Sequence, residues 1–208
     1  MQGAGGIYRI QIAFKPRWYH FCVTRAGYVL VGGRSSRMGR DKALLPFRGE
    51  PLACSVARQV ALAAGSATLV GEPDLHRRLP YSVIPDVFPG EGPLAGILTA
   101  LRHTSSEWNL IVACDMPELT ADFLSNLLAV ADARQTTVVP QGPSGRLEPL
   151  CIVWRRSALP AIEAAFRAGV RKVAAALADL AVTVYPVTEV APFQNVNTLE
   201  EWNRHAAK

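Results

Sequence analysis

Residues 28–42 read YVLVGGRSSRMGRDK, an apolar run followed by a glycine pair and a basic loop. Val29, Leu30 and Val31 are consecutive β-formers and predict a short buried strand. Gly32 and the glycine after it end that strand with backbone that can come close to a ligand. The loop that follows is rich in hydrogen-bond donors: Arg34, Ser35, Ser36, Arg37, Arg40 and Lys42. Because a donor-rich loop at a strand end suits phosphate groups, the segment indicates a nucleotide-phosphate site.

The spacing of this loop differs from that of two common phosphate loops. The dinucleotide fingerprint needs G-x-G-x-x-G, and the Walker loop needs four residues between its glycine and Gly-Lys-Ser/Thr; neither is present. The pattern here is GG-x3-R-M-G-x-D-K, which resembles the signature of nucleotidyltransferases that activate sugars and cofactors. A glycine-rich turn that binds nothing is the alternative, but the basic loop ending in Lys42 favours phosphate binding.

The composition is typical of one large domain with a sizeable core, since half of the 208 residues are hydrophobic. The net charge of +5 comes from basic residues scattered along the chain, so an anionic small substrate explains it as well as a nucleic acid does. The sequence has neither a basic helix nor an aromatic stacking platform, which makes a nucleic-acid binder the weakest hypothesis. No run approaches the ~18 apolar residues of a membrane span.

Neither the cysteines nor the histidines have the spacing of metal ligands. The four cysteines form no C-x-x-C pair: Cys22, Cys54, Cys114 and Cys151. Cys114 and Cys151 lie within apolar runs, which suits buried, reduced thiols of a cytoplasmic protein. The histidines are expected at surface or half-buried positions: His20, His76, His103 and His205. Residues 1–26 lack the apolar centre and the cleavage site of a secretory signal, and we expect them to be an over-extended start or a disordered arm.

Residues 27–208 alternate short apolar strands with helices, which predicts one doubly wound, Rossmann-like α/β domain with a mostly parallel sheet. Strands are expected at 29–31, 67–70, 81–84, 108–114, 136–139, 149–154 and 182–185; helices are expected at 51–64, 94–101, 121–131, 157–168 and 172–180, and from residue 198. The link between 136–139 and 149–154 is too short for a crossover, so the sheet is mixed near one edge. Ligands of such sheets lie beyond the carboxyl ends of the strands.

Three side chains at these predicted strand ends suit catalysis on a phosphate. Asp115 directly follows the most apolar strand, where α/β enzymes hold a divalent metal beside phosphate oxygens, and one carboxylate is enough for Mg²⁺. Lys42 suits the charge that develops on a leaving pyrophosphate, and Arg37 suits a bidentate phosphate contact. A turn or helix-capping aspartate is the alternative for Asp115. Three roles are open for Asp86. It suits a hydrogen bond from a base or a ribose hydroxyl, a place in the outer shell of the metal, or an Asx-turn in its proline-rich loop.

Five segments taken together resemble the molybdenum cofactor guanylyltransferases in order and separation, from about Tyr28 to Trp202. They are LVGGRSSRMGRDK (30–42), PDVFPGEGPLAGI (85–97), VACDMP (112–117), RLEPLCIVW (146–154) and FQNVNTLEEW (193–202). The first segment is shared by many nucleotidyltransferases, whereas its combination with the second and the last is more specific. The resemblance implies a fold of the nucleotide-diphospho-sugar transferase type.

The resemblance also implies roles for individual residues. The backbone at Leu30, Val31 and Gly32 would line the guanine nucleotide. Lys42 and Asp86 would contact GTP, and Asp115 would both contact GTP and hold Mg²⁺. Two asparagines, Asn195 and Asn197, would lie at the rim of the substrate site.

The implied reaction transfers GMP from GTP to molybdenum-loaded molybdopterin and releases pyrophosphate, in a cytoplasmic protein that binds neither nucleic acid nor a membrane. Two departures leave the base open. Val31 stands where the family usually has alanine, and Gly71–Asp74 contains no asparagine for the base. The alternatives are therefore a sibling transferase that uses CTP or another phosphorylated acceptor, and a non-catalytic nucleotide-binding module that docks onto a molybdoenzyme or its chaperone. Lys42 and Asp115 together favour catalysis.

Overall fold

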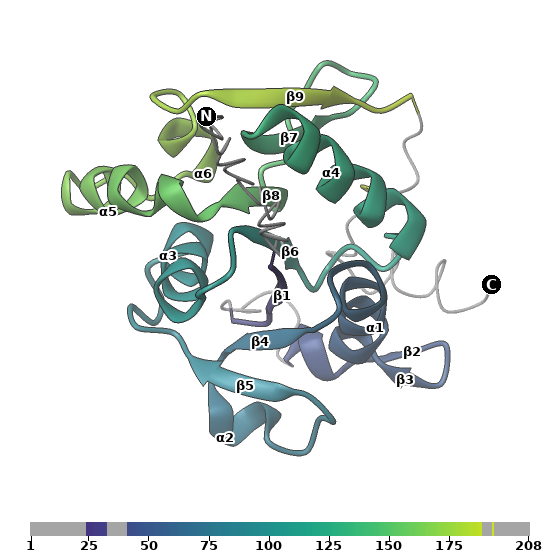
Figure 1. Ribbon diagram of the computed structural model, residues 1–208. Coiled ribbons are helices and arrows are strands. Elements are labelled where there is room, and N and C mark those ends of the chain that lie inside the picture. Colours follow the sequence, from purple (N-terminus) through teal and green to yellow (C-terminus); the bar gives the residue numbers. More distant parts are fainter. Residues whose placement is uncertain (1–23, 33–40, 189–192, 194–208) are drawn as a thin grey trace, which may run out of the picture.

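The computed structural model describes residues 24–32, 41–188 and 193, and it contains one seven-stranded sheet with helices on both faces (Figure 1). Along the sheet the order is β5 (Ser82–Pro85), β4 (Thr68–Gly71), β1 (Arg25–Leu30), β6 (Trp108–Ala113), β8 (Cys151–Arg155), β7 (Thr137–Gln141) and β9 (Val182–Pro186). A two-stranded hairpin, β2 (Pro46–Phe47) and β3 (Glu50–Pro51), lies outside it.

The sheet is mostly parallel and mixed towards one side, as predicted. Strand β1 pairs in parallel with both β4 and β6, β4 pairs in parallel with β5, and β7 pairs in parallel with β9. Strand β8 is antiparallel to both β6 and β7, between which it lies. The carboxyl ends of β5, β4, β1 and β6 therefore lie along one edge, where ligands of parallel sheets bind.

The helices cover the two faces of the sheet because neighbouring residues of each strand point to opposite sides. Val29 packs in the core cluster with α1 (Leu52–Ala64) and α4 (Ala121–Arg134). Leu30 packs in the other cluster with α3 (Pro93–His103) and α5 (Leu159–Arg167). Figure 1 shows these two helix pairs on opposite sides of the strands. Within the described residues, no helix is both long enough and apolar enough to cross a membrane.

The ends of the main helices agree with the signals in the sequence. Helix α1 ends at Gly65, which has φ +82°, and helix α3 has Pro93 in its first turn. Thr120 caps α4 by accepting a hydrogen bond from the backbone N–H of Phe123 at 3.3 Å. These residues confirm the predicted helix boundaries at those ends, because each has the backbone or side-chain chemistry that the position requires.

Several local predictions were wrong. Strand β1 begins at Arg25 and not at residue 29, because its polar and small residues pair with β6 from Trp108 onward; it therefore includes two residues of the segment expected to be an arm. The helix expected at 172–180 is only α6 (Val173–Ala176), one turn held by a few buried side chains, as short helices are marginal without packing. Five short elements were not expected: the hairpin strands β2 and β3, helix α2 (Pro73–His76), and the 3-10 turns η1 (Lys42–Leu44) and η2 (Arg156–Ala158). The helix expected from residue 198 lies outside the described residues.

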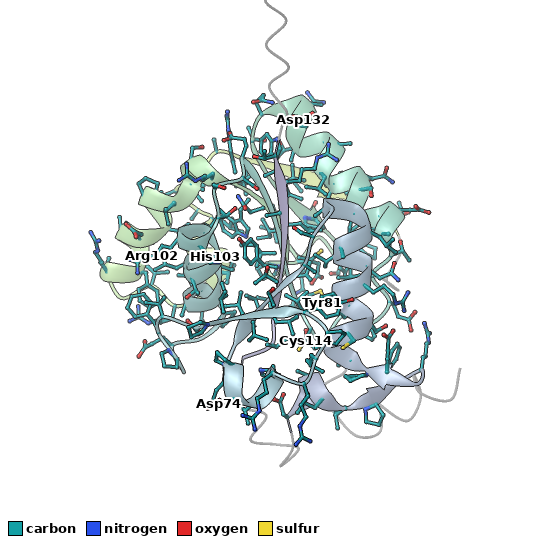
Figure 2. All side chains as sticks on the ribbon, turned by 60° about the horizontal axis from the view of Figure 1, so that its bottom comes forward. Asp74, Tyr81, Arg102, His103, Cys114 and Asp132 are labelled. Carbon is teal, nitrogen blue, oxygen red and sulfur yellow. The ribbon has the colours of Figure 1, made fainter. Side chains whose placement is uncertain are left out.

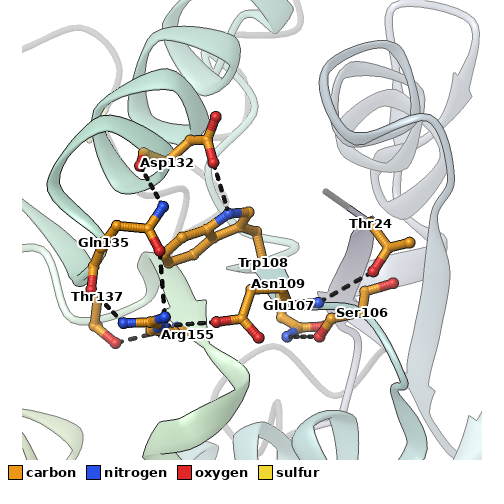
Figure 3. Close-up of polar contacts among 9 residues, drawn as sticks. All are labelled: Thr24, Ser106, Glu107, Trp108, Asn109, Asp132, Gln135, Thr137 and Arg155. Atoms are coloured by element: carbon orange, nitrogen blue, oxygen red, sulfur yellow. Dashed lines mark hydrogen bonds and ion pairs between the residues drawn. The ribbon is translucent and has the colours of Figure 1, made fainter. Parts of the chain in front are cut away.

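A polar cluster closes the amino end of β6, at the edge opposite to the predicted site (Figure 3). Arg155 donates from Nε to Glu107 Oε1 at 2.6 Å and from Nη1 to the backbone oxygen of Gln135 at 2.7 Å. Its guanidinium carbon also lies 5.6 Å from the ring centroid of Trp108. The Trp108 ring in turn donates to Asp132 at 3.3 Å. Arg155 therefore joins the ends of β8, β6 and α4.

We expect Arg155→Lys to lower the free energy of unfolding by about 1–2 kcal/mol, because one ammonium cannot reproduce several directed bonds and the ring contact. Urea unfolding measures this loss. The matched control is Arg167→Lys, since Arg167 forms an exposed 3.7 Å ion pair with Glu163; its cost should stay below about 0.5 kcal/mol. Equal costs for the two variants would contradict a joining role for Arg155.

Candidate functional site

The candidate site lies where the two central parallel strands end side by side. The strand-like pairing continues past both ends: Cys114 N donates to Leu30 O at 3.1 Å, and Val31 N donates to Val70 O at 3.0 Å. Gly32 and Asp115 therefore leave the sheet from adjacent strands at the same edge. In Figure 2, Cys114 and Asp74 lie towards one end of the molecule and Asp132 lies at the other.

Lys42 and Asp115 meet at this edge although 73 residues separate them in the chain. Lys42 Nζ lies 3.4 Å from Asp115 Oδ2, and the two side chains are 16% and 18% exposed. The other oxygen, Asp115 Oδ1, is buried and accepts no hydrogen bond from the described residues. An unsatisfied buried carboxylate oxygen is costly, so this atom favours a ligand that supplies positive charge.

A divalent metal bound through nucleotide phosphates fits this arrangement. Within the described residues, no three His, Cys, Asp or Glu side chains gather as a metal site, so an all-protein metal cage is not formed there. Mg²⁺ usually keeps waters and takes one or two carboxylates together with substrate phosphates. The Oδ1 atom of Asp115 would be such a single carboxylate ligand, and Lys42, 3.4 Å from Oδ2, would lie beside the phosphates.

At the end of β1, the backbone is available to a ligand because the side chains there point into the two cores. Leu30 and Val31 are buried in the cores on opposite faces of the sheet, whereas Gly32 is exposed. A Cβ on Gly71 would lie 2.7 Å from Val31 Cγ2 and 3.5 Å from His76 Cε1, so β4 packs directly against both side chains. The valine that replaces the family's usual alanine thus points into the core.

Asp86 forms the local turn that was the alternative interpretation of this residue. Its Oδ1 accepts hydrogen bonds from Phe88 N and from Thr99 Oγ1, both at 3.0 Å. Thr99 Oγ1 also accepts from Val87 N at 3.0 Å, which ties the proline-rich loop to α3. Both bonds to the Asp86 side chain end on Oδ1, so a contact to a nucleotide would fall to Oδ2.

His76 was expected to be a surface or half-buried residue, and that expectation was wrong. The side chain lies on α2, and the residue is 1% exposed. Its Nε2 lies 2.8 Å from Asp41 Oδ2, and its Nδ1 lies 2.9 Å from the backbone oxygen of Glu72. Asp41 directly precedes Lys42, so this pair lies beside the predicted site. The only signal in the sequence that could have predicted the position of His76 was Glu72-Pro73, which starts a helix just after β4.

Burial and hydrogen bonding shift the pKa values of this pair in opposite directions. The hydrogen bond to Asp41 raises the pKa of His76 above 6.5 and outweighs the burial of the ring. Burial works to raise the pKa of Asp41, but the bonds from His76 and Ala43 N outweigh it and hold that pKa below 3.8. Both shifts favour the charged forms of the two side chains.

The cysteine thiols near the site are not suited to nucleophilic attack. Cys54, Cys114 and Cys151 are buried free thiols, which agrees with the prediction for Cys114 and Cys151. Burial raises the pKa of the Cys114 thiol to about 12. Because the thiolate is the reactive form, the residue next to Asp115 serves packing and not covalent catalysis. Cys22 lies outside the described residues.

Three predicted site residues lie outside the part of the chain that the structure describes: Arg37, Asn195 and Asn197. Their roles stay predictions. The described residues nonetheless bring together the end of β1, Lys42 and Asp115, as expected for loops at the carboxyl edge of a parallel sheet. The roles of these residues towards a nucleotide likewise stay predictions.

Comparison with known proteins gives consistent results. A family model described as "MobA-like NTP transferase domain" matches residues 27–182. The molybdenum cofactor guanylyltransferase of Xanthomonas euvesicatoria is 35% identical over 184 residues, covering 86% of this chain and 92% of that protein. The molybdenum cofactor guanylyltransferase of Cupriavidus metallidurans is 30% identical over 191 residues, covering 88% and 94%.

A solved structure shares both fold and sequence with this chain. The molybdopterin-guanine dinucleotide biosynthesis protein A of Archaeoglobus fulgidus superposes with a TM-score of 0.74 and 27% identity, covering 88% of this chain and 97% of that one. The similarity therefore spans nearly the whole length of that protein.

Proposed function

Because the chain belongs to the MobA-like NTP transferase family, we propose that it transfers GMP from GTP to molybdenum-loaded molybdopterin. The products are the molybdopterin guanine dinucleotide cofactor and pyrophosphate. Relatives that bear this activity in their names match over most of their own length. The observation that carries the proposal is the ion pair between Lys42 on η1 and Asp115 after β6, with Asp115 Oδ1 buried and unpartnered among the described residues.

In the proposed reaction, a terminal phosphate oxygen of the acceptor attacks the α-phosphorus of GTP. The bond from the α-phosphorus to the bridging oxygen breaks, and pyrophosphate leaves with the electron pair. The chain's task is to align two polyanions and to stabilise the charge that develops on the leaving group. No covalent intermediate on the protein is needed.

Each described residue has a definite part in this scheme. The backbone at Leu30, Val31 and Gly32 lines the nucleotide, because the side chains of the first two are buried in the cores. Lys42 contacts the phosphates and stabilises the departing pyrophosphate. Asp115 holds Mg²⁺ through Oδ1. When bound there, Mg²⁺ supplies positive charge to the phosphate oxygens as a Lewis acid.

The remaining residues act in binding under this proposal. Asp86 contacts GTP through Oδ2 while its Oδ1 keeps the turn. Arg37 contacts the phosphates, and Asn195 and Asn197 form the rim on the acceptor side. The buried, reduced thiols suit a cytoplasmic enzyme, and a molybdoenzyme or its chaperone is the proposed recipient of the product. We propose no contact with nucleic acid.

A nucleotide panel tests the proposal. The purified full chain is incubated with Mg²⁺ and molybdenum-loaded molybdopterin, and GTP, CTP, ATP or UTP is added separately. Pyrophosphate release and dinucleotide formation are both measured, with the Asp115→Asn variant as the control for contaminating activity. We expect turnover with GTP alone. A preference for CTP would identify the sibling transferase, and nucleotide binding without turnover would leave a different acceptor or the non-catalytic module.

A further inference from the structure

The surroundings of His76 favour a ring that is protonated on both nitrogens. The ring lies between two oxygens, Glu72 O at 2.9 Å from Nδ1 and Asp41 Oδ2 at 2.8 Å from Nε2. A backbone oxygen only accepts hydrogen bonds, so Nδ1 must carry a proton. Although burial raises the pKa of Asp41, the hydrogen bonds from His76 and Ala43 N hold it below 3.8, so near neutral pH Asp41 is a carboxylate. Its Oδ2 can then only accept a hydrogen bond, and Nε2 carries a proton as well. With both nitrogens donating, the ring is an imidazolium.

Asp41 connects this imidazolium to the residue after it. Asp41 is the N-cap of η1: its Oδ1 accepts from Ala43 N, and its backbone oxygen accepts from Leu44 N at 3.2 Å. Lys42 is the first residue of η1, and from there its side chain reaches Asp115. One oxygen of Asp41 thus holds the backbone that carries Lys42, while the other is held by His76.

We propose that His76 is a positioning residue for the transfer reaction: its imidazolium holds Asp41, and through Asp41 and η1 it determines where Lys42 lies beside Asp115. The kinetic consequence of this role rests on the proposed function. The charge of the ring, its contact with Asp41 and the placement of Lys42 do not depend on that function, so they are tested separately.

The surroundings of His76 make the contact dependent on pH. Asp41 faces the ring from the start of η1. Glu72, the N-cap residue of α2, adds negative charge, and Asp74 is the acidic residue within α2. Strand β5 packs on α2 and has no titratable side chain, and the end of β4 presents Gly71 to the ring. The raised pKa means that the charged pair is fully present below pH 6.5 and is lost as the pH rises through that pKa. At the acid end the pair persists until the pH falls through the lowered pKa of Asp41.

Nitrogen-15 histidine spectra of the full chain test the charge directly. The chain has 4 histidines, and the His76 signals are assigned by their loss in the His76→Gln variant. We expect both ring nitrogens to be protonated at pH 6.5, with a titration midpoint above that value. A midpoint at or below 6.5 would overturn the proposal, whatever reaction the protein catalyses.

The placement of Lys42 is measured by acetylation and mass spectrometry. Lys42 is 16% exposed in its ion pair, whereas Lys172 is exposed and serves as the internal reference. In the His76→Gln variant we expect Lys42 to be acetylated about fivefold faster while the rate at Lys172 is unchanged, because a side chain released from an ion pair is more reactive. An unchanged Lys42 rate would refute the positioning role. If His76→Gln does not fold, the same acetylation measurement on Asp41→Asn tests whether loss of the His76–Asp41 contact releases Lys42.

Kinetics separates positioning from a purely structural role. We expect His76→Gln to lower kcat about tenfold with little change in the affinity for GTP, since Lys42 acts chiefly on the developing charge. The ratio of wild-type to variant kcat should approach one as the pH rises through the raised pKa of His76. Leu75→Ala, an exposed change on α2, should leave kcat unaltered. A kcat ratio that does not change with pH, or a lower melting temperature with normal kcat, would indicate that His76 only stabilises the fold. Absence of transfer by the wild-type protein would refute the proposed function. The charge of His76 and the placement of Lys42 would then still be tested by the spectra and by acetylation.

Discussion

Asp115→Asn is expected to lower kcat for guanylyl transfer about 10³-fold, equivalent to about 4 kcal/mol of transition-state stabilisation at about 1.4 kcal/mol per tenfold. The substitution keeps the shape of the side chain but removes the negative charge that would hold Mg²⁺. Affinity for GTP should persist in part, because the backbone at the end of β1 and Lys42 remain. Initial rates of pyrophosphate release and calorimetric titration with GTP measure the two effects.

A neighbouring acidic residue provides the control for Asp115. Glu118 pairs with Arg48 at 3.0 Å through side chains that are 24% and 46% exposed. Glu118→Gln removes the same charge from the same loop region and should change kcat less than about twofold, as expected for an exposed pair. Normal turnover by Asp115→Asn would show that the metal assignment is wrong.

Lys42→Met should lower kcat about 10²-fold, because the variant retains the apolar stem of the side chain but not the charge that stabilises the leaving pyrophosphate. Its effect on GTP affinity should be smaller than its effect on kcat. The matched control is Lys172→Met, which removes one exposed positive charge from the N-cap of α6 and should leave kcat near the wild-type value.

A double-mutant cycle tests whether the two residues act together. Lys42 Nζ and Asp115 Oδ2 are 3.4 Å apart, so combining Lys42→Met with Asp115→Asn should cost much less than the product of the single effects. Fully multiplicative losses would mean that Lys42 and Asp115 contribute to different steps.

Local patterns in the sequence predicted most of the fold because each depends on near neighbours. The apolar strand at Trp108–Ala113, the capping Thr120 and the left-handed Gly65 all appear where expected. The antiparallel direction of β8 was also predicted, because the link between β7 and β8 is too short for a crossover. Lys42 and Asp115 were expected at one edge from topology alone, since both follow strands of a parallel sheet.

The features that the sequence did not predict depend on residues that are far apart in the chain. His76 looks like a surface residue until Asp41, 35 residues earlier, is placed against it. The start of β1 at Arg25 has no apolar signal, and only pairing with β6 makes it a strand. The 172–180 segment has helical spacing, but few of its side chains find a core to pack against. Burial and pairing of this kind are tertiary effects that override local propensity.

The parallel pairing of β1 with β6 has a consequence for biosynthesis on the ribosome. Strand β1 is made before β6, and its register runs from Arg25 against Trp108 to Leu30 against Ala113, so one of its two edges stays unpaired until β6 has emerged. Non-local parallel pairs of this kind form slowly. A nascent chain that stalls before β6 would expose a ready strand edge, and such edges promote aggregation. The Lys42–Asp115 pair accordingly cannot form before β6 has been made and has paired with β1.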